Sequence, residues 1–127
     1  MEDSSNSVNQ LIALMEALPF VSWFKDKEGR FTRVNSILLN SLQKDAEEVI
    51  GRTSREVFGR VEAKHDEEGD LEVLDQGRVS RATYSRNQRI FQSVRFPVFG
   101  VKGQVEGTGG YQEDITNLAR SLSDLHM

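Results

Sequence analysis

Cysteine is absent from this sequence of 127 residues, and histidine and proline occur only twice each. Without cysteine, the chain cannot form a disulfide, a thiolate nucleophile, a cysteine zinc site or a cysteine-held iron–sulfur cluster. Two histidines are also a poor basis for any other zinc site. The absence of cysteine suits a reducing compartment, and we expect a cytoplasmic protein.

Long apolar runs and dense basic clusters are missing as well. No apolar stretch approaches the roughly 20 residues that a membrane-spanning helix needs, and the acidic first residues lack the basic flank and apolar core of a signal peptide. The net charge is −4, and no basic cluster is dense enough to follow a phosphate backbone. The composition therefore disfavours membrane insertion and direct binding of nucleic acid.

The length and composition are those of one globular domain. Hydrophobic residues make up 37% and charged residues 28% of the chain, which is enough for a real core. We expect a disordered tail over residues 1–7, a folded domain over residues 8–116 and a further helix over residues 117–127. Catalytic patterns are missing: there is no nucleophile–base pair at a recognised spacing and no phosphate-binding glycine loop.

Residues 20–35 organise the prediction of the fold. Two apolar, β-prone runs flank a polar turn, in which Asp26 suits the first position and Gly29 the left-handed position that closes it. Asn35 then precedes a run with helical spacing and is a good N-cap, because its side-chain oxygen can accept a free backbone N–H. This stretch predicts a strand, a turn, a second strand and a capped helix.

Helices are predicted on both sides of this hairpin. Apolar residues recur at helical spacing over residues 8–18, and the helix should stop before Pro19, which disfavours a helical conformation in the residue before it. Short helical turns are expected over residues 45–50 and, from a capping box that begins at Thr53, over residues 53–58.

A longer helix and three strands are predicted in the second half. The helix over residues 61–76, ended by Gly77, has a thin apolar face, and we expect it to be the most mobile helix. Three β-prone runs follow at residues 79–86, 89–99 and 104–115; both faces of the middle run carry apolar groups, so its register is ambiguous. Hairpin pairs with helices gathered between them predict an α+β domain, with one antiparallel sheet and helices on one face.

The C-terminal residues Ile115, Leu118, Leu122 and Leu125 are spaced three, four and three residues apart. This is the spacing of a short heptad seam, which buries its apolar side chains against a second helix. The helix over residues 8–18 also carries an apolar stripe. We therefore predict a homodimer that forms through these two helices.

Seven short motifs follow one another in a recognisable order: Ala17-Leu18-Pro19 with Trp23, Asp26-Lys27-Glu28-Gly29-Arg30-Phe31, Val34-Asn35, Glu48-Val49-Ile50-Gly51-Arg52-Thr53, Val73-Leu74 with Gly77, then Pro97 with Gly103 and Gly107, and Asp114-Ile115-Thr116. In this order, over about residues 11–116, they resemble a PAS domain, the sensory module of bacterial histidine kinases, diguanylate cyclases and transcription regulators. Within the resemblance, Asp26, Gly29 and Asn35 form the fold signature and are not expected to bind the signal.

The resemblance implies a five-stranded antiparallel sheet whose helices enclose a small pocket. Domains of this family are usually not enzymes; they bind a ligand or cofactor, or dimerise, and pass a conformational change to the helix that follows. The signal relay then falls on Asp114, Ile115 and Thr116. A helix N-cap at Asp114 or Thr116 is the simpler interpretation, and the two are compatible, because a cap that forms or breaks is a two-state element.

Four residues of the predicted later strands are candidates to line the pocket: Tyr84, Gln92, Arg95 and Gln112. Gln112 matches a glutamine that contacts flavin in the light-sensing branch of the family; the alternative is an exposed strand residue. Arg95, if it points inward, needs an anionic ligand or a carboxylate, since an unpaired buried charge is costly. We expect the pocket to take a small metabolite or to remain empty.

Haem and flavin are the cofactors that the resemblance brings into consideration. His65 stands on the helix from which haem-binding members take an axial ligand, but carboxylates surround it in the sequence, so an exposed position is the better interpretation. Ser54 stands where the flavin branch has the cysteine that forms a thiol adduct, which serine cannot form. Ser54 is better explained as the first turn of a capped helix. We therefore expect neither cofactor and no metal.

These observations predict a non-catalytic PAS sensor or dimerisation module of bacterial signal transduction, for example of a two-component system. Its effector, such as a histidine kinase or a diguanylate cyclase, would lie in the same polypeptide. The alternative from another class is a photoreceptor or redox sensor loaded with flavin or haem, which would be coloured when purified. An enzyme on a similar scaffold is a third option, and the missing catalytic residues disfavour it.

Overall fold

The order of elements along the chain is that of an α+β domain whose strands are joined mainly by short hairpins. The structure is a computed structural model that describes residues 2–125. Its elements are α1 (Glu2–Ala17), β1 (Val21–Asp26), β2 (Phe31–Val34), α2 (Ser36–Leu42), the 3₁₀ turn η1 (Ala46–Glu48), α3 (Ser54–Phe58), α4 (Arg60–Gln76), β3 (Ser80–Arg86), β4 (Arg89–Phe99), β5 (Val105–Asp114) and α5 (Thr116–Leu125).

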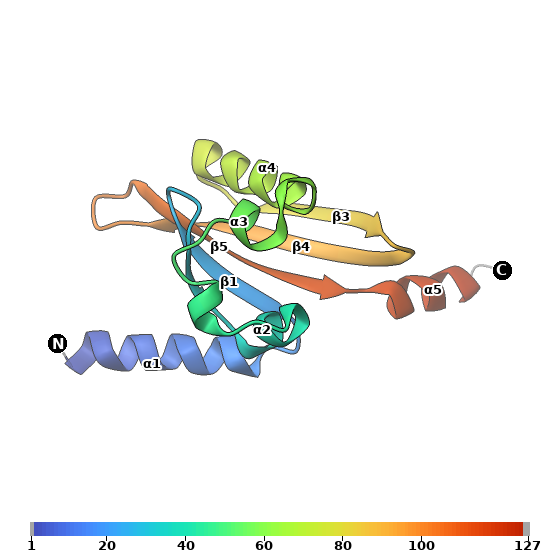
Figure 1. The fold of residues 1–127 in the computed structure, drawn as a ribbon, viewed down its shortest axis with the longest axis horizontal. Helices are drawn as coiled ribbons and strands as arrows, with labels where there is room; N and C mark the ends of the chain where they lie inside the picture. Colours follow the sequence, from blue (N-terminus) through green and yellow to red (C-terminus); the bar gives the residue numbers. More distant parts are fainter. Residues whose placement is uncertain (1, 126–127) are drawn as a thin grey trace.

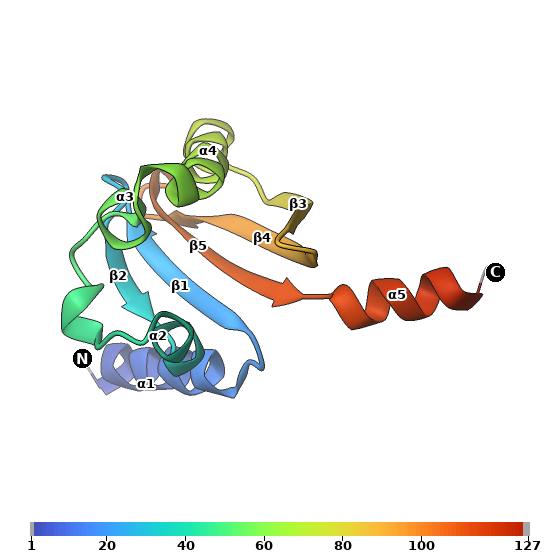
Figure 2. The same ribbon diagram turned by 45° about the vertical axis from the view of Figure 1, so that its right-hand side comes forward.

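The strands form one antiparallel sheet in the order β2-β1-β5-β4-β3, with β5 in the centre (Figure 1). Helices α2, α3 and α4 lie over one face of this sheet, which we call the inner face. Helix α1 runs beneath α2 at the β1–β2 edge, and α5 extends away from the sheet beyond the end of β5 (Figure 2). This is the five-stranded α+β architecture that the sequence predicts.

The local signals in the sequence form the predicted turns and caps. The Asp26 carboxylate accepts hydrogen bonds from the N–H groups of Glu28 and Arg30, and Gly29 closes the turn at φ +81°. A non-glycine residue would be strained at that φ. Thr53 opens α3 with both hydrogen bonds of a capping box. Each of these interactions joins residues at most four apart.

Asn35 joins three elements around the start of α2. Its side chain is fully buried, and its Oδ1 accepts from the backbone N–H groups of Ser22 and Leu38 at 3.2 and 3.1 Å. Its Nδ2 donates to the carbonyl oxygens of Met15 and Phe20 at 3.0 and 2.9 Å. The predicted N-cap is therefore confirmed, and the same amide also ties α2 to β1 and to the end of α1.

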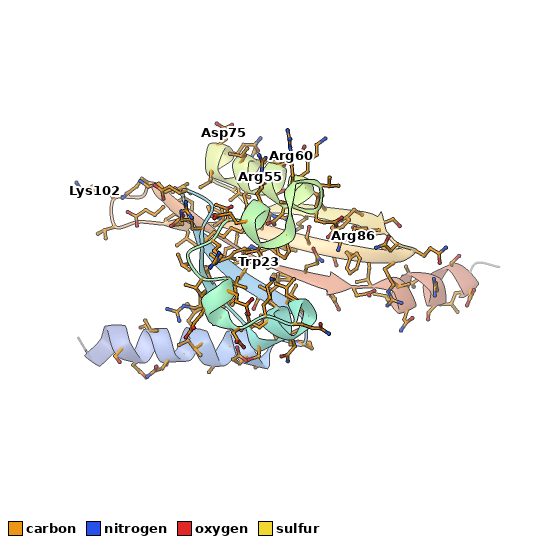
Figure 3. The ribbon with its side chains drawn as sticks, viewed as in Figure 1. Trp23, Arg55, Arg60, Asp75, Arg86 and Lys102 are labelled. Carbon is orange, nitrogen blue, oxygen red and sulfur yellow. The ribbon has the colours of Figure 1, made fainter. Side chains whose placement is uncertain are left out.

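The layer between the helices and the sheet has two unlike halves. Under α2 and α3 it is an apolar cluster built on Trp23, Phe31, Leu38 and Val49, and Figure 3 shows Trp23 in the middle of this layer. Gly110 lies beside the indole, where a Cβ atom would come within 2.6 Å of the ring. Under α4 the layer is polar, and this half belongs to the site described below.

The start of α1 differs from the predicted start of the folded domain. The disordered tail was predicted over residues 1–7, but α1 begins at Glu2, so residues 2–7 are helical; Met1 lies outside the described residues. Across residues 2–125, no helix combines the length and apolar character that crossing a bilayer requires.

Replacement of Asn35 by alanine tests the role of this residue in the fold. The change leaves two buried N–H groups and two carbonyl oxygens without their partner, and we expect the free energy of unfolding to fall by at least about 2 kcal/mol. Urea denaturation followed by Trp23 fluorescence measures it. Asn40→Ala, at an exposed position of the same helix, is the matched control and should change stability by less than about 0.5 kcal/mol. Equal losses in the two variants would show that Asn35 is an ordinary helix residue.

Candidate ligand cavity and buried charge network

A cavity of about 1180 Å³ lies between the inner face of the sheet and the helices α2, α3 and α4. Most of its wall is apolar, and the side chains that form this part are Phe20, Val21, Trp23, Phe31, Leu38, Leu42, Val57, Phe58 and Phe91. A concave, mostly apolar space with a few polar groups is the usual form of a small-molecule site. The cavity is therefore the candidate functional site of the domain.

Three polar side chains meet on one wall of the cavity. Tyr84 on β3 donates its hydroxyl hydrogen to Oε1 of Gln112 on β5 at 2.6 Å. The ring of His65 on α4 packs against Tyr84 with a centroid distance of 4.3 Å, and the ring of Phe91 stacks on Tyr84 at 5.6 Å. Burial and the nearby charge of Arg95 lower the pKa of His65, which favours the neutral imidazole.

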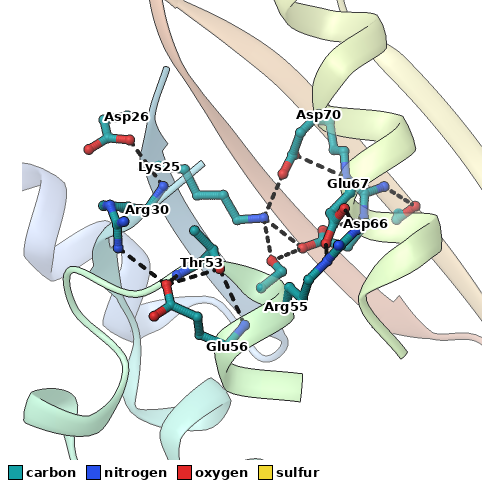
Figure 4. Close-up of polar contacts among 12 residues, drawn as sticks. Lys25, Asp26, Arg30, Thr53, Arg55, Glu56, Asp66, Glu67 and Asp70 are labelled. Carbon is teal, nitrogen blue, oxygen red and sulfur yellow. Dashed lines mark hydrogen bonds and ion pairs between the residues drawn. The ribbon is translucent and has the colours of Figure 1, made fainter. Parts of the chain in front are cut away.

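A buried network of four charged side chains lies beside the cavity (Figure 4). Lys25 on β1, which is 3% exposed, donates to Asp66 at 2.6 Å, to Asp70 at 2.5 Å and to the hydroxyl of Ser54 at 2.7 Å. Arg95 on β4, which is 4% exposed, donates to the other oxygen of Asp66 at 2.7 Å. Two cations and two carboxylates make the network neutral, which removes most of the penalty of burying them.

The geometry of the network sets the protonation of its two carboxyl groups. Burial opposes the charge of Asp66, but the neighbouring Lys25 and Arg95 outweigh it and hold the pKa of Asp66 at about 2. Burial and the negative charge of Asp66 raise the pKa of Asp70, although Lys25 lies against it. Asp66 is thus the carboxylate that the network needs charged, whereas Asp70 tolerates a proton more easily.

Helix α4 is attached to the sheet largely through this network. The residues that α4 buries include Ala63, Asp70 and Val73, so little apolar surface faces the sheet. Gly69 has a specific role, because a Cβ atom there would lie 2.9 Å from the side chain of Arg95. The glycine that weakens the helix in isolation therefore makes room for the arginine that anchors it.

A second polar cluster lies where β5 ends and α5 begins. The Asp114 carboxylate accepts from the backbone N–H of Thr116 at 3.0 Å and from its hydroxyl at 2.6 Å, and Arg89 binds its other oxygen at 2.8 Å. Thr116 is fully buried and its hydroxyl accepts from the N–H of Ile90 at 2.8 Å. The hydrogen bonds from Thr116, supported by Arg89, hold the pKa of Asp114 at about 2. These contacts attach the first turn of α5 to the edge between β4 and β5.

Comparison with known proteins identifies the family. The sequence matches the family described as the PAS fold over residues 15–120, which is most of the chain. This domain belongs to the PAS family. PAS domains are sensor modules of signal-transduction proteins and are generally not catalytic, and the match points to no enzyme family.

Three relatives illustrate the range of proteins that this PAS domain resembles. The methanogenesis regulatory histidine kinase FilI of Methanothrix harundinacea is 28% identical over 137 residues, which cover 98% of this chain and 16% of the kinase. The PAS domain of BvgS from Bordetella pertussis superposes with a TM-score of 0.66 at 23% identity, covering 95% of this chain and 97% of that one. The phage VqmA–DPO complex superposes with a TM-score of 0.73 at 20% identity, covering 98% of this chain and 60% of that one. At these identities the two structures show the fold alone.

Three of the four predicted pocket residues line the cavity of the PAS domain, and one does not. Tyr84, Arg95 and Gln112 contribute to its wall. The prediction for Gln92 is wrong, because Gln92 is not among the residues that line the cavity. It lies between Phe91 and Ser93 on β4, and alternation along a strand places its side chain on the opposite face from those of Phe91 and Arg95. The ambiguous register of this strand caused the error, since only the packing of α4 shows which face is inward.

Arg95 was expected to need an anionic ligand or a carboxylate if it points inward. Its side chain does point inward, and its partner is the carboxylate of Asp66. Sequence reasoning missed Lys25, Asp66 and Asp70 as a group. The available signal was weak: Asp66 and Asp70 lie four residues apart, on the helix face that also carries Ala63 and Val73. Such a pattern is usually a solvated face, and nothing in the sequence links it to a lysine more than 40 residues earlier.

The two residues considered for cofactors have ordinary structural positions in the PAS domain. Ser54 begins α3 behind the Thr53 cap, as predicted, and is also buried in the charge network. His65 is exposed at the cavity mouth beside Tyr84. Among residues 2–125, no three histidine or carboxylate side chains are grouped so that they could hold a metal ion. Expectations about haem and flavin remain predictions.

Exchange of each network carboxylate for an amide tests the assignment of their charges. Since the folded-state pKa of Asp66 is depressed, its contribution to stability is present above the unfolded pKa and is lost as the pH falls toward about 2. We expect Asp66→Asn to lower the free energy of unfolding by about 2 kcal/mol at pH 7. Asp70→Asn, one turn along the same helix, should lower it less, because the raised pKa of Asp70 means that folding favours its neutral form.

Urea titrations of the wild type and the two variants at pH 7 and at pH 3 measure these effects. The gap between Asp66→Asn and the wild type should narrow at the lower pH, where Asp66 in the wild type is closer to its pKa. An Asp70→Asn variant that is less stable than Asp66→Asn at pH 7 would reverse the assignment.

Proposed function

We propose that this PAS domain is a non-catalytic sensor that binds a small molecule in the cavity and relays a conformational change through Asp114, Ile115 and Thr116 into α5. The signal then passes to an effector in the same polypeptide, such as a histidine kinase or a diguanylate cyclase. The domain acts as a homodimer, and the setting is cytoplasmic signal transduction.

One observation carries the proposal. Gln112, on the cavity wall, and Asp114, which caps α5, are two residues apart on β5, so their side chains lie on the same face of one strand. A ligand that displaces Gln112 therefore strains the residue that holds α5. Ile115 strengthens this connection, because its N–H donates to the carbonyl oxygen of Ile90 on the neighbouring strand at 2.8 Å.

The relatives support both the proposed effector and the proposed ligand of this domain. FilI is a histidine kinase of which the matching region covers 16%, which leaves room for an effector in the longer protein. The VqmA structure is a complex with the ligand DPO, and its fold is similar to this one. The activity of a whole protein that contains this domain remains part of the proposal.

Exposed apolar side chains support the dimer. On α5, Leu118, Leu122 and Leu125 are 58%, 50% and 79% exposed, at the spacing of a heptad seam. On α1, Val8 and Ile12, four residues apart on the predicted stripe, are also exposed, whereas Met15 of the same stripe is buried in the domain. An apolar stripe of this kind is costly to leave in water, and a second copy of the same helix covers it with matching spacing.

Native mass spectrometry of the purified chain, combined with its absorption spectrum, tests ligand and dimer together. We expect a colourless dimer that retains or takes up a small molecule. The double variant Leu118→Glu/Leu122→Glu should be monomeric, because charges replace the seam, while Leu71→Glu at an exposed position of α4 should remain dimeric. A visible absorption band would favour the flavin or haem sensor. A monomeric wild type at high concentration would contradict the dimer.

The relay is tested by Asp114→Ala, which removes the acceptor for Thr116 and the partner of Arg89. We expect amide hydrogen exchange to speed up in residues 114–121, because the first turn of α5 loses its cap, while the urea midpoint moves less than in Asn35→Ala. Asp124→Ala, near the other end of α5, is the control and should leave exchange in this segment unchanged. If Asp114→Ala instead unfolds the whole domain, Asp114 is a structural residue and the relay lies elsewhere.

A further inference from the structure

The charges on the cavity wall are already matched within the protein. Of the two arginines that line the cavity, Arg95 is paired with Asp66, and Arg86 is paired with Glu62 at 2.8 Å across the mouth between β3 and α4. A ligand carboxylate, sulfonate or phosphate would therefore have to break an existing ion pair to gain a cation. Breaking the buried Arg95–Asp66 pair leaves an uncompensated charge, which is strongly unfavourable. The Arg86–Glu62 pair is half exposed, so water screens Arg86 and weakens its attraction for an anionic ligand.

A cationic ligand meets the same obstacle. Asp66 lines the cavity but already binds both Lys25 and Arg95, and Asp114 binds Arg89. Glu113 also borders the cavity, but it is exposed to solvent. A surface carboxylate contributes little to holding an ion, because water screens it.

Neutral hydrogen-bonding groups on the cavity wall that remain available include the Tyr84–Gln112 pair and the indole N–H of Trp23, which is buried and has no hydrogen-bond partner among the described residues. The bond within the pair uses the single donor of Tyr84 and one acceptor position of Gln112. The amide nitrogen of Gln112 still has two N–H donors, and the phenol oxygen of Tyr84 still has a lone pair. The ring of His65 packs against that of Tyr84 beside this pair. The available donors are therefore neutral N–H groups, and that of Gln112 lies at one end of a mostly apolar space.

We infer that the cavity selects an uncharged, mostly apolar small molecule with a hydrogen-bond acceptor at one end, such as a ketone or amide oxygen, and that Gln112 is the residue that recognises this acceptor. The inference rests on the proposed function, since it specifies the ligand class of the same cavity. The apolar body of the ligand lies against Trp23, Phe58 and Phe91, and the acceptor lies at the end of the cavity nearest to α5.

Two dyes of similar size, one neutral and one anionic, test the ligand class. Prodan is a neutral naphthalene with a ketone, and anilinonaphthalene sulfonate is an anionic naphthalene; both absorb where tryptophan emits. Trp23 is the only tryptophan and lines the cavity, so quenching of its emission by energy transfer reports binding near the cavity for either dye. We expect saturable quenching by prodan and an affinity for the sulfonate that is about tenfold lower or weaker still.

Two matched variants test the role of Gln112. Gln112→Met keeps the length of the side chain and removes its N–H donors, so prodan should bind about threefold to tenfold more weakly. The emission of bound prodan should also shift to the blue, because its ketone loses a hydrogen bond. Gln92→Met is the same substitution on the opposite face of the neighbouring strand, and it should change neither the affinity nor the emission.

A third variant tests the charge argument by itself. Asp66→Asn leaves Lys25 and Arg95 with a single carboxylate, so the network gains a positive charge and the sulfonate should bind more tightly relative to prodan. If this variant does not fold, the dye preference of the wild type still decides the point.

The outcomes separate this inference from the proposed function. Equal or tighter binding of the sulfonate by the wild type, or equal effects of Gln112→Met and Gln92→Met, overturns the ligand class and leaves a sensor cavity of another selectivity. If neither dye quenches Trp23 and native mass spectrometry finds no bound molecule, the cavity is not a ligand site, and the ligand-binding part of the proposed function fails as well.

Discussion

The ion pairs that join Lys25 and Arg95 to Asp66 and Asp70 are the interaction on which the architecture of this PAS domain depends. They connect β1 and β4 to α4, and the hydroxyl of Ser54 adds α3. Any one of these charges alone would be too costly to bury, and together they form a neutral cluster with short hydrogen bonds. Helix α4 has little apolar surface of its own to bury, so electrostatics replaces the hydrophobic contact that usually attaches a helix to a sheet.

The same network shapes the cavity. Asp66 and Arg95 belong to both, so one end of the cavity wall is held by ion pairs while the other end is an apolar cluster around Trp23. Arg95 also lies over the Trp23 ring at 5.7 Å, which links the two halves by a cation–π contact. The charges of this half are paired with one another, and the neutral Tyr84–Gln112 pair is the group that we propose meets a ligand.

The central strand β5 runs from the cavity wall to the start of α5. It pairs with β1 on one side and β4 on the other, and its inner face carries Gly110, Gln112 and Asp114 in sequence. Gly110 admits the indole, Gln112 borders the cavity and Asp114 caps α5. The proposed relay therefore follows a few residues of one strand from the cavity wall to α5.

The sequence by itself determined the features whose interactions are local. The turn at Asp26 and Gly29, the caps at Asn35 and Thr53, and the end of α4 at Gly77 follow from hydrogen bonds and backbone angles within about four residues, and the order of the motifs identified the family. Tertiary structure alone decided the rest. The partners of Lys25 are 29 to 45 residues away along the chain. Whether the side chain of Arg95 or that of Gln92 points inward depends on which face of the sheet α4 covers. Long-range pairing of charges leaves no periodic pattern in a sequence. An aspartate that the fold buries beside a cation and one that stays in water cannot be told apart in the sequence.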